Sequence, residues 1–185
     1  MQINPDIFKA YDVRGLYPGE INEEVARLIG RGFAAYLKTD RVAVSRDMRV
    51  SSPGIAAAFT DGVLMQGTDV VDCGMLGTDM LYFAVAHDNL GGGAQITASH
   101  NPKEYNGVKM VRSGALPLSG DAGIGDIRTM IANNALPAPA PRRGSLASRD
   151  IVPEYVEKVM SFIDPAAIEP FSVVLDAGSG MAGLV

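Results

Sequence analysis

The sequence has one cysteine and no long apolar run, and each shortage excludes a class of protein. With only Cys73, no disulfide can form within the chain, so a reducing compartment is expected. No apolar run approaches the roughly 20 residues that a membrane helix needs, so no membrane partner is expected. The first 20 residues carry Asp6, Lys9, Asp12 and Arg14 without an apolar stretch. No secretory signal is therefore expected, and the cytoplasm is the predicted location.

Positive charge is also scarce, because 16 Lys+Arg face 21 Asp+Glu and leave a net charge of −5. Nucleic-acid phosphates favour a basic face, so a nucleic-acid partner is not expected. Hydrophobic residues make up 47% and charged residues 20%, which indicates a folded core rather than disorder. The chain has 185 residues. At about 150 residues per domain, this length predicts one domain and a remainder. The sequence sets no oligomeric state.

Helical and strand patterns alternate along the chain. Apolar spacings of three and four predict helices over residues 22–37, 52–67, 78–86, 122–134 and 151–163. Short β-type runs predict strands over residues 41–46, 69–75, 93–98, 107–112 and 171–176. Asn22, Ser52 and Thr78 are the predicted N-caps of the first three helices. Strands separated by helices indicate an α/β fold with a mixed sheet covered by helices on both faces.

The composition changes after residue 134. Ala135–Ser148 contains three prolines and no helical stripe, which predicts a linker or an extended connection. We therefore predict an α/β domain over residues 1–135, a linker over 136–149, and the incomplete start of a second α/β domain over 150–185. The sequence shows no internal repeat.

The densest polar cluster, Ser99, His100, Asn101 and Lys109, lies between two predicted strands, where open α/β sheets place their sites. A surface turn would be polar too. The G-x-S-x-G elbow of serine hydrolases is absent, and His100, as the next residue, would point away from Ser99. A phosphoserine suits these neighbours better, because Lys109, His100 and backbone N–H groups could balance its charge.

Other motifs have simpler interpretations. The segment 8–15, with its arginine, is either a solvated tether or an arm folded over a site, where Arg14 could grip phosphate. Residues 178–183 match G-x-G-x-x-G, but no helix or acidic ribose partner follows, so a turn is expected. In the loop 45–49, an ion pair of Asp47 with an arginine on the surface is favoured over phosphate binding. Cys73 is predicted to be a small core residue. No metal-ligand pattern is visible.

Three segments together resemble the α-D-phosphohexomutase family, of the phosphomannomutase/phosphoglucomutase type. Ile7–Gly15 resembles its N-terminal signature, Ile96–Lys109 its phosphoserine loop, and Val173–Gly183 the opening of its second domain. The resemblance spans the whole chain in the right order, and the serine loop is a specific motif.

The resemblance implies roles for these residues. Ser99 would carry a phosphoryl group, pass it to a hexose phosphate to form a 1,6-bisphosphate, and take back the other one. The enzyme would thus interconvert hexose 1-phosphate and 6-phosphate of mannose, glucose or both. By similarity, the catalytic residues are Ser99, Lys109, Arg14 and His100, and the substrate-binding residues are Tyr11 and Asn101.

The resemblance also implies cofactors. Mg²⁺ would bridge phosphorylated Ser99 and an Asp-rich loop, and the hexose 1,6-bisphosphate would be intermediate and activator. Family members have four domains, so this chain is expected to be an N-terminal part that is inactive alone. Two alternatives stay open: a non-catalytic phosphosugar-binding or regulatory module, and a small serine hydrolase.

Overall fold

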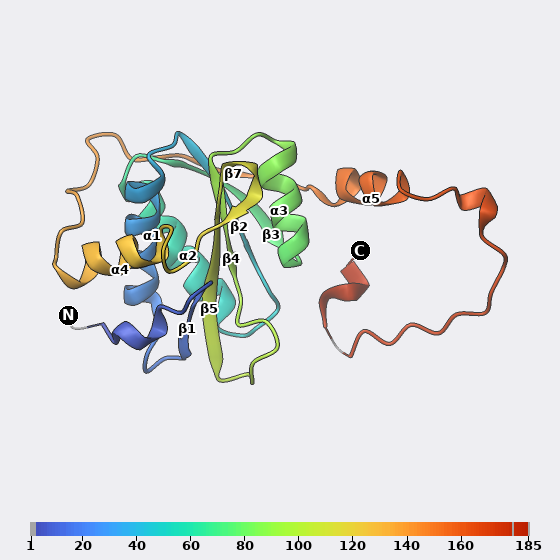
Figure 1. The fold of residues 1–185 in the computed structure, drawn as a ribbon, viewed down its shortest axis with the longest axis horizontal. Coiled ribbons are helices and arrows are strands. Elements are labelled where there is room, and N and C mark those ends of the chain that lie inside the picture. The colour runs from blue at the N-terminus through green and yellow to red at the C-terminus, as the bar shows by residue number, and fades with distance from the viewer. Residues whose placement is uncertain (1–2, 179, 185) are drawn as a thin grey trace.

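The computed structural model describes residues 3–178 and 180–184, and a mixed sheet forms its centre (Figure 1). Its strands are β1 (Val13–Leu16), β2 (Arg41–Arg46), β3 (Asp69–Met75), β4 (Gly92–Ile96), β5 (Tyr105–Arg112), β6 (Leu116–Pro117) and β7 (Leu146–Ser148). The order is β1-β5-β4-β2-β3-β7, and β6 pairs with β5. Strands β4, β2, β3 and β7 are parallel, whereas β5 is antiparallel to β4, β1 and β6.

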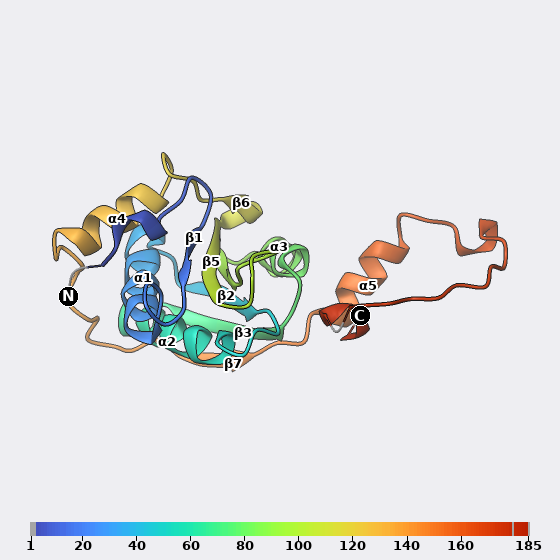
Figure 2. The same cartoon turned by 90° about the horizontal axis from the view of Figure 1, so that it is seen from below.

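Helices cover both faces of the sheet. They are α1 (Glu23–Leu37), α2 (Ser52–Met65), α3 (Thr78–His87) and α4 (Ile124–Ala132), whereas α5 (Val152–Met160) lies to the side of the sheet and contacts α3. Helices α1 and α2 lie on one face with α4 against α1, and α3 lies on the other face (Figures 1 and 2). The chain steps from β2 to β3 in one direction and from β3 to β4 in the other. Right-handed crossovers therefore place α2 and α3 on opposite faces. The predicted mixed sheet with both faces covered is confirmed.

Helix starts follow the sequence prediction in one case of three. The side chain of Asn22 accepts a hydrogen bond from the N–H of Val25 at 3.0 Å, so this predicted N-cap is confirmed. The predictions for Ser52 and Thr78 are wrong, because each is the first helical residue and the caps, Ser51 and Gly77, make no side-chain capping bond. The hydroxyl of Ser52 is used elsewhere, in the loop network described below.

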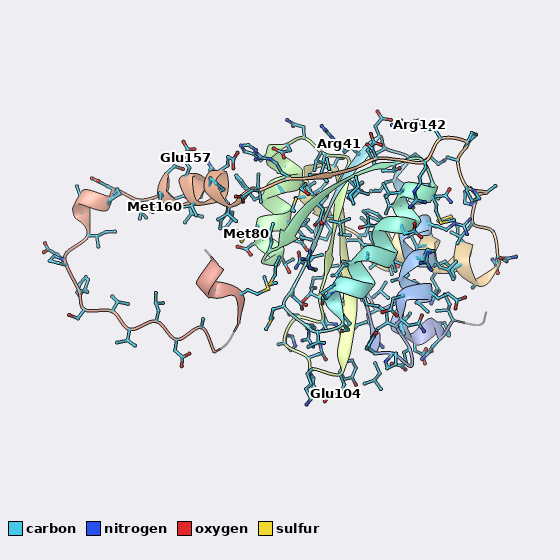
Figure 3. The ribbon with its side chains drawn as sticks, turned by 180° about the vertical axis from the view of Figure 1, so that it is seen from behind. Arg41, Met80, Glu104, Arg142, Glu157 and Met160 are labelled. Atoms are coloured by element: carbon cyan, nitrogen blue, oxygen red, sulfur yellow. The ribbon has the colours of Figure 1, made fainter. Side chains whose placement is uncertain are left out.

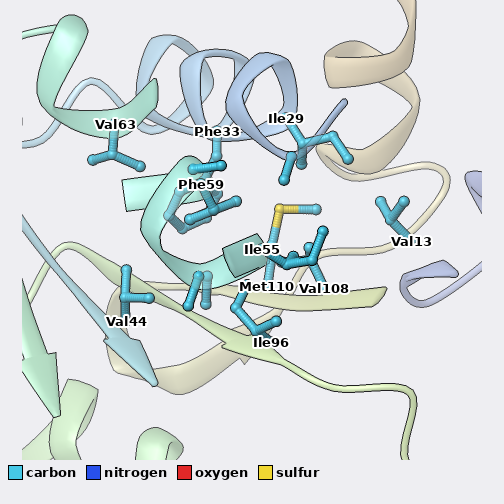
Figure 4. Packing of buried hydrophobic residues seen from close by; sticks show 14 of the residues in the cluster. Val13, Ile29, Phe33, Val44, Ile55, Phe59, Val63, Ile96, Val108 and Met110 are labelled. Carbon is cyan, nitrogen blue, oxygen red and sulfur yellow. The ribbon is translucent and has the colours of Figure 1, made fainter. Parts of the chain in front are cut away.

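Two apolar clusters hold the layers together. Between the sheet and α1 and α2, side chains from both elements interdigitate, and the rings of Phe33 and Phe59 lie 5.6 Å apart between centroids (Figure 4). A second cluster lies under α3 and contains Leu81, Val85 and Cys73. The prediction that Cys73 is a core residue is confirmed. The close packing of helices on both faces therefore holds the strands of the sheet in place, and with them the loops at the strand ends.

The predicted connection over residues 135–148 passes the C-terminal end of α2 and ends in β7, which pairs with β3 in parallel at the edge of the sheet. The domain boundaries themselves stay a prediction. No helix in the described part of the chain is long and apolar enough to cross a membrane.

The predicted strand over residues 171–176 is wrong. This segment is extended but belongs to no sheet (Figures 1 and 3). Val174 within it is 96% exposed. A strand pattern becomes a strand only beside a neighbour with free N–H and C=O groups, and no described strand lies beside this one. The predicted turn over residues 178–183 includes Ser179, which lies outside the described residues.

Candidate active site

Two polar loops meet at one end of the sheet, which Glu104 marks in Figure 3. Since β2 and β4 are parallel, the loops that follow them, residues 47–51 and 97–104, leave from the same end. The N–H of Asp47 donates to the carbonyl of Ile96 at 2.9 Å, and that of Thr97 to Gly107 at 3.0 Å. The loop of the predicted phosphoserine is thus tied to both β2 and β5.

Ser99 has a backbone conformation that is rare for a residue with a side chain, with φ at +54°. Its N–H donates to Oγ1 of Thr97 at 2.8 Å, and that hydroxyl donates to Asp47 at 2.8 Å. Such a conformation costs on the order of 1–3 kcal/mol and persists only where the surroundings enforce it. The buried hydrogen bonds of Thr97 supply part of that constraint.

Asp47 is the buried centre of this network, a role that the sequence did not reveal. Its carboxylate accepts from Oγ of Ser52 at 2.5 Å, Oγ1 of Thr97 at 2.8 Å and Nε of Arg49 at 3.1 Å. The predicted ion pair with an arginine is confirmed, but both side chains are only 11% exposed, so its placement on the surface is wrong. Ser52 and Arg49 are near Asp47 in the chain, but Thr97 is 50 residues away at the end of another strand, which local spacing cannot indicate.

Ser99, His100 and Asn101 line one open hollow of about 760 Å³, together with Arg49 and Lys103. Oγ of Ser99 lies 3.4 Å from Nδ1 of His100, so the two neighbours face each other, which the sequence interpretation did not expect. Both the N–H and the side-chain amide of Asn101 donate to the carbonyl of Ala98, at 3.0 and 3.1 Å. This pair of bonds closes the turn that presents Ser99.

The two predicted cations, Arg14 and Lys109, meet at one carboxylate. Asp12 lies 2.5 Å from Nη2 of Arg14 and 3.5 Å from Nζ of Lys109. Neither cation hydrogen-bonds to Ser99 in the described chain. Nε of Arg14 is buried and has no hydrogen-bond partner among the described residues, so this guanidinium keeps an unused donor.

The strand register shows how near this cationic pair is to the serine loop. Arg14 pairs with Gly107, and the carbonyl of Gly107 accepts from Thr97. The backbones of Arg14 and Thr97 are therefore two strands apart, roughly 10 Å, at about 4.8 Å per strand. Burial raises the pKa of Tyr82 on α3, and the charge of Asp12 raises this pKa further, so the cluster faces α3. Tyr11 is 72% exposed, and the structure does not bring it into either group.

Comparison with known proteins shows the family to which this domain belongs. The family model described as "Phosphoglucomutase/phosphomannomutase, alpha/beta/alpha domain I" matches residues 5–137, well over half of the chain. The chain belongs to the phosphoglucomutase/phosphomannomutase family. The resemblance seen in the sequence is thereby confirmed for the family.

Relatives within the phosphoglucomutase/phosphomannomutase family are similar over nearly the whole chain. A phosphomannomutase of Escherichia coli is 42% identical over 180 residues, which cover 96% of this chain and 40% of that protein. A protein named phosphohexose mutases, from Xanthomonas campestris, is 40% identical over 178 residues with the same coverage. The chain thus spans about 40% of the length of these curated relatives.

Solved structures agree with the family fold. A phosphoglucomutase/phosphomannomutase family protein from Burkholderia thailandensis superposes with a TM-score of 0.79 at 35% identity, covering 86% of this chain and 36% of that one. A protein described as a putative phosphomannomutase, from Thermus thermophilus, gives 0.76 at 26% identity, covering 90% and 37%.

The described residues do not bring together the ligands that a metal ion needs. Within residues 3–178 and 180–184, no group of three or more His, Cys, Asp or Glu side chains could hold an ion. Magnesium would therefore need ligands other than these, besides a phosphate on Ser99. Cys73 is buried, and burial raises the pKa of its thiol to about 12, which disfavours the thiolate that a nucleophile needs.

Proposed function

We propose that this chain is the phosphoryl-carrying domain of a phosphohexomutase that interconverts the 1- and 6-phosphates of mannose, glucose or both. The observation that carries the proposal is Ser99, presented in a constrained left-handed turn with its hydroxyl on an open hollow. Family membership adds that relatives of this domain are named phosphomannomutases. The phosphosugar is the proposed partner, and the cytoplasm stays a prediction from the single cysteine.

The proposed reaction balances without any net consumption of phosphate. The bond from phosphorus to Oγ of Ser99 breaks as a bond forms to the free hydroxyl of a hexose monophosphate. That hydroxyl gives up its proton, and Ser99 regains one. In the return step, Oγ of Ser99 attacks the other phosphoryl group of the bisphosphate and the protons move the opposite way.

The local charge fits a phosphoserine. A phosphate on Ser99 would bring about −2, and Arg14 and Lys109 lie within two strands of its loop. Arg14 has an unused buried Nε donor, and both cations now share Asp12. A phosphate would therefore compete with Asp12 for the two cations. Positioning and such charge neutralisation together account for most of the catalysis in phosphoryl transfer.

We further propose that phosphorylated Ser99 would be one ligand of a Mg²⁺ ion, which would supply positive charge beside the transferring group. The described residues do not form a complete site. The remaining ligands would therefore lie outside the described residues. The hexose 1,6-bisphosphate is proposed to be both intermediate and activator.

Phosphoryl uptake tests the proposal directly. The 185-residue chain is incubated with glucose 1,6-bisphosphate, and the phosphoryl group is located by peptide mass spectrometry. We expect one group on Ser99, none in Ser99→Ala, and normal uptake in Ser113→Ala, which changes an exposed serine elsewhere. A folded chain that takes up no phosphoryl group at Ser99 would contradict the phosphohexomutase proposal and favour the non-catalytic module.

We also propose that the chain alone does not turn over hexose phosphates, because it spans only about 40% of the length of its relatives. A coupled mutase assay measures this, and turnover near that of a whole mutase would refute it. Labelling of Ser99 by a fluorophosphonate would instead support the serine hydrolase. We expect none, because Thr97 and Asn101 stand where the G-x-S-x-G motif of such enzymes has its two glycines.

A further inference from the structure

Arg49 lies beside Ser99 but faces the protein backbone. We infer that Arg49, anchored by Asp47, is a positioning residue that holds the loop from Ser99 to Tyr105 in the conformation that phosphoryl transfer needs. The inference rests on the proposed function of Ser99 and adds the residue that determines how its loop is presented. Arg49 itself touches neither the hydroxyl of Ser99 nor, in this role, the substrate.

The guanidinium of Arg49 makes five hydrogen bonds. Its Nε donates to Asp47 at 3.1 Å; its two terminal nitrogens donate to the carbonyls of Ser99 (2.9 Å), Asn101 (2.6 Å), Pro102 (2.7 Å) and Tyr105 (3.0 Å). A guanidinium has five N–H donors in a fixed plane. One side chain therefore ties four carbonyls within a seven-residue loop to the strand end of β2.

Because its donors are all used, Arg49 does not fit phosphate binding, the less favoured alternative for its loop in the sequence analysis. Every donor of Arg49 is engaged, and its side chain is only 11% exposed. Arg14, by contrast, keeps a buried Nε without a partner among the described residues. We assign phosphate contact to Arg14 and positioning to Arg49.

Both backbone groups of Ser99 are held through Asp47. The carbonyl of Ser99 accepts from Arg49, and its N–H donates to Thr97, whose hydroxyl donates to Asp47. Arg49 and Thr97 share the same carboxylate oxygen, Oδ2. These bonds fix the left-handed turn, and with it the direction of Oγ. Such preorganisation matters because displacement by about 1 Å can cost roughly 100-fold in rate.

We call the hold of Arg49 on the loop from Ser99 to Tyr105 the Arg49 clamp. Hydrogen exchange in Arg49→Lys tests this clamp independently of any reaction. Lysine keeps the charge beside Asp47 but cannot span four carbonyls with a planar fork. We expect the amides of Ser99, Asn101 and Tyr105 to exchange about 10-fold faster or more, with α1 unchanged. Arg128→Lys, an exposed arginine on α4, is the matched control. Unchanged protection of the loop in Arg49→Lys would overturn the inference.

A second variant keeps the test decisive if Arg49→Lys folds poorly. Thr97→Val removes the hydroxyl between Ser99 and Asp47 but leaves the bonds of Arg49 in place. We expect faster exchange at the amide of Ser99 and little change at Tyr105. If Tyr105 lost as much protection as Ser99 in Thr97→Val, the inference would be overturned, because the bonds of Arg49 would then not hold the far end of the loop.

Phosphoryl uptake separates failure of this inference from failure of the proposed function. We expect Arg49→Lys to take up the group from glucose 1,6-bisphosphate about 10-fold more slowly than wild type. We also expect added guanidinium ion to restore part of the rate in Arg49→Ala. A wild-type chain that stays unphosphorylated refutes the function, while exchange still decides the clamp. Equal uptake rates in wild type and Arg49→Lys refute the clamp alone.

Discussion

Gly107 joins three strands at the candidate site and allows a sharp test of how the fold places Arg14. It pairs with Arg14 on β1, and its carbonyl accepts from Thr97 at the end of β4. A Cβ at this position would lie 2.2 Å from the carbonyl oxygen of Val13 and 3.0 Å from that of Thr97. Both clashes are with backbone, so no side-chain rotation can relieve them.

The size of the expected effect follows from these distances. An ordinary contact begins at 3.4 Å, so in Gly107→Ala the carbonyl of Val13 must withdraw by about 1.2 Å. Strand β5 is held by β4 on its other side, whereas β1 is a four-residue edge strand. We therefore expect β1 to move and to carry Arg14 with it. Overpacking of this kind costs about 1–3 kcal/mol.

Urea unfolding and phosphoryl uptake measure the two consequences of Gly107→Ala. We expect a lower unfolding midpoint at constant slope, and uptake at Ser99 slowed by up to about 100-fold. Gly19→Ala is the control, because no heavy atom lies within 4 Å of its added Cβ. If Gly107→Ala matched the wild type within about 0.5 kcal/mol and kept the uptake rate, the steric argument would be refuted.

Three further predictions concern the rest of the chain. The buried Cys73 thiol, with its pKa raised to about 12, should resist iodoacetamide in the folded chain and react after unfolding in urea; fast native labelling would contradict its burial. Hydrogen bonds from Arg27, and to a smaller extent from Arg143, lower the pKa of Asp61 in the folded chain. The ionised Asp61 therefore stabilises the folded state at neutral pH, and this contribution is lost as the pH falls through the folded pKa. Asp61→Asn should therefore cost under about 1 kcal/mol at pH 7 and nothing in acid, measured by urea unfolding at several pH values; a pH-independent difference would contradict this. Phe59→Ala should cost about 3–5 kcal/mol by the same method, and a loss below 1 kcal/mol would contradict its place in the core.

Local pattern predicted most of the elements in this fold. Helix α1 and strands β2 and β3 agree with the predicted ranges to within one residue at either end, because their apolar periodicity and the Asn22 cap are local signals. The predicted strand 171–176 shows where such signals fail. Its residues have a strand pattern, but a strand is completed by a partner, and pairing is a property of the tertiary structure.

In the candidate site, too, some features follow from the sequence and others only from the tertiary structure. The sequence by itself determined that Ser99, His100 and Asn101 share one polar loop, since they are neighbours in the chain, and the motif around them indicated the family. Only the tertiary structure decided that Arg49 binds that loop from 50 residues away, and that Arg14 and Lys109 meet at Asp12. The physical reason is that hydrogen bonds and ion pairs depend on distances of about 3 Å in space, which strand order and register set and local spacing does not.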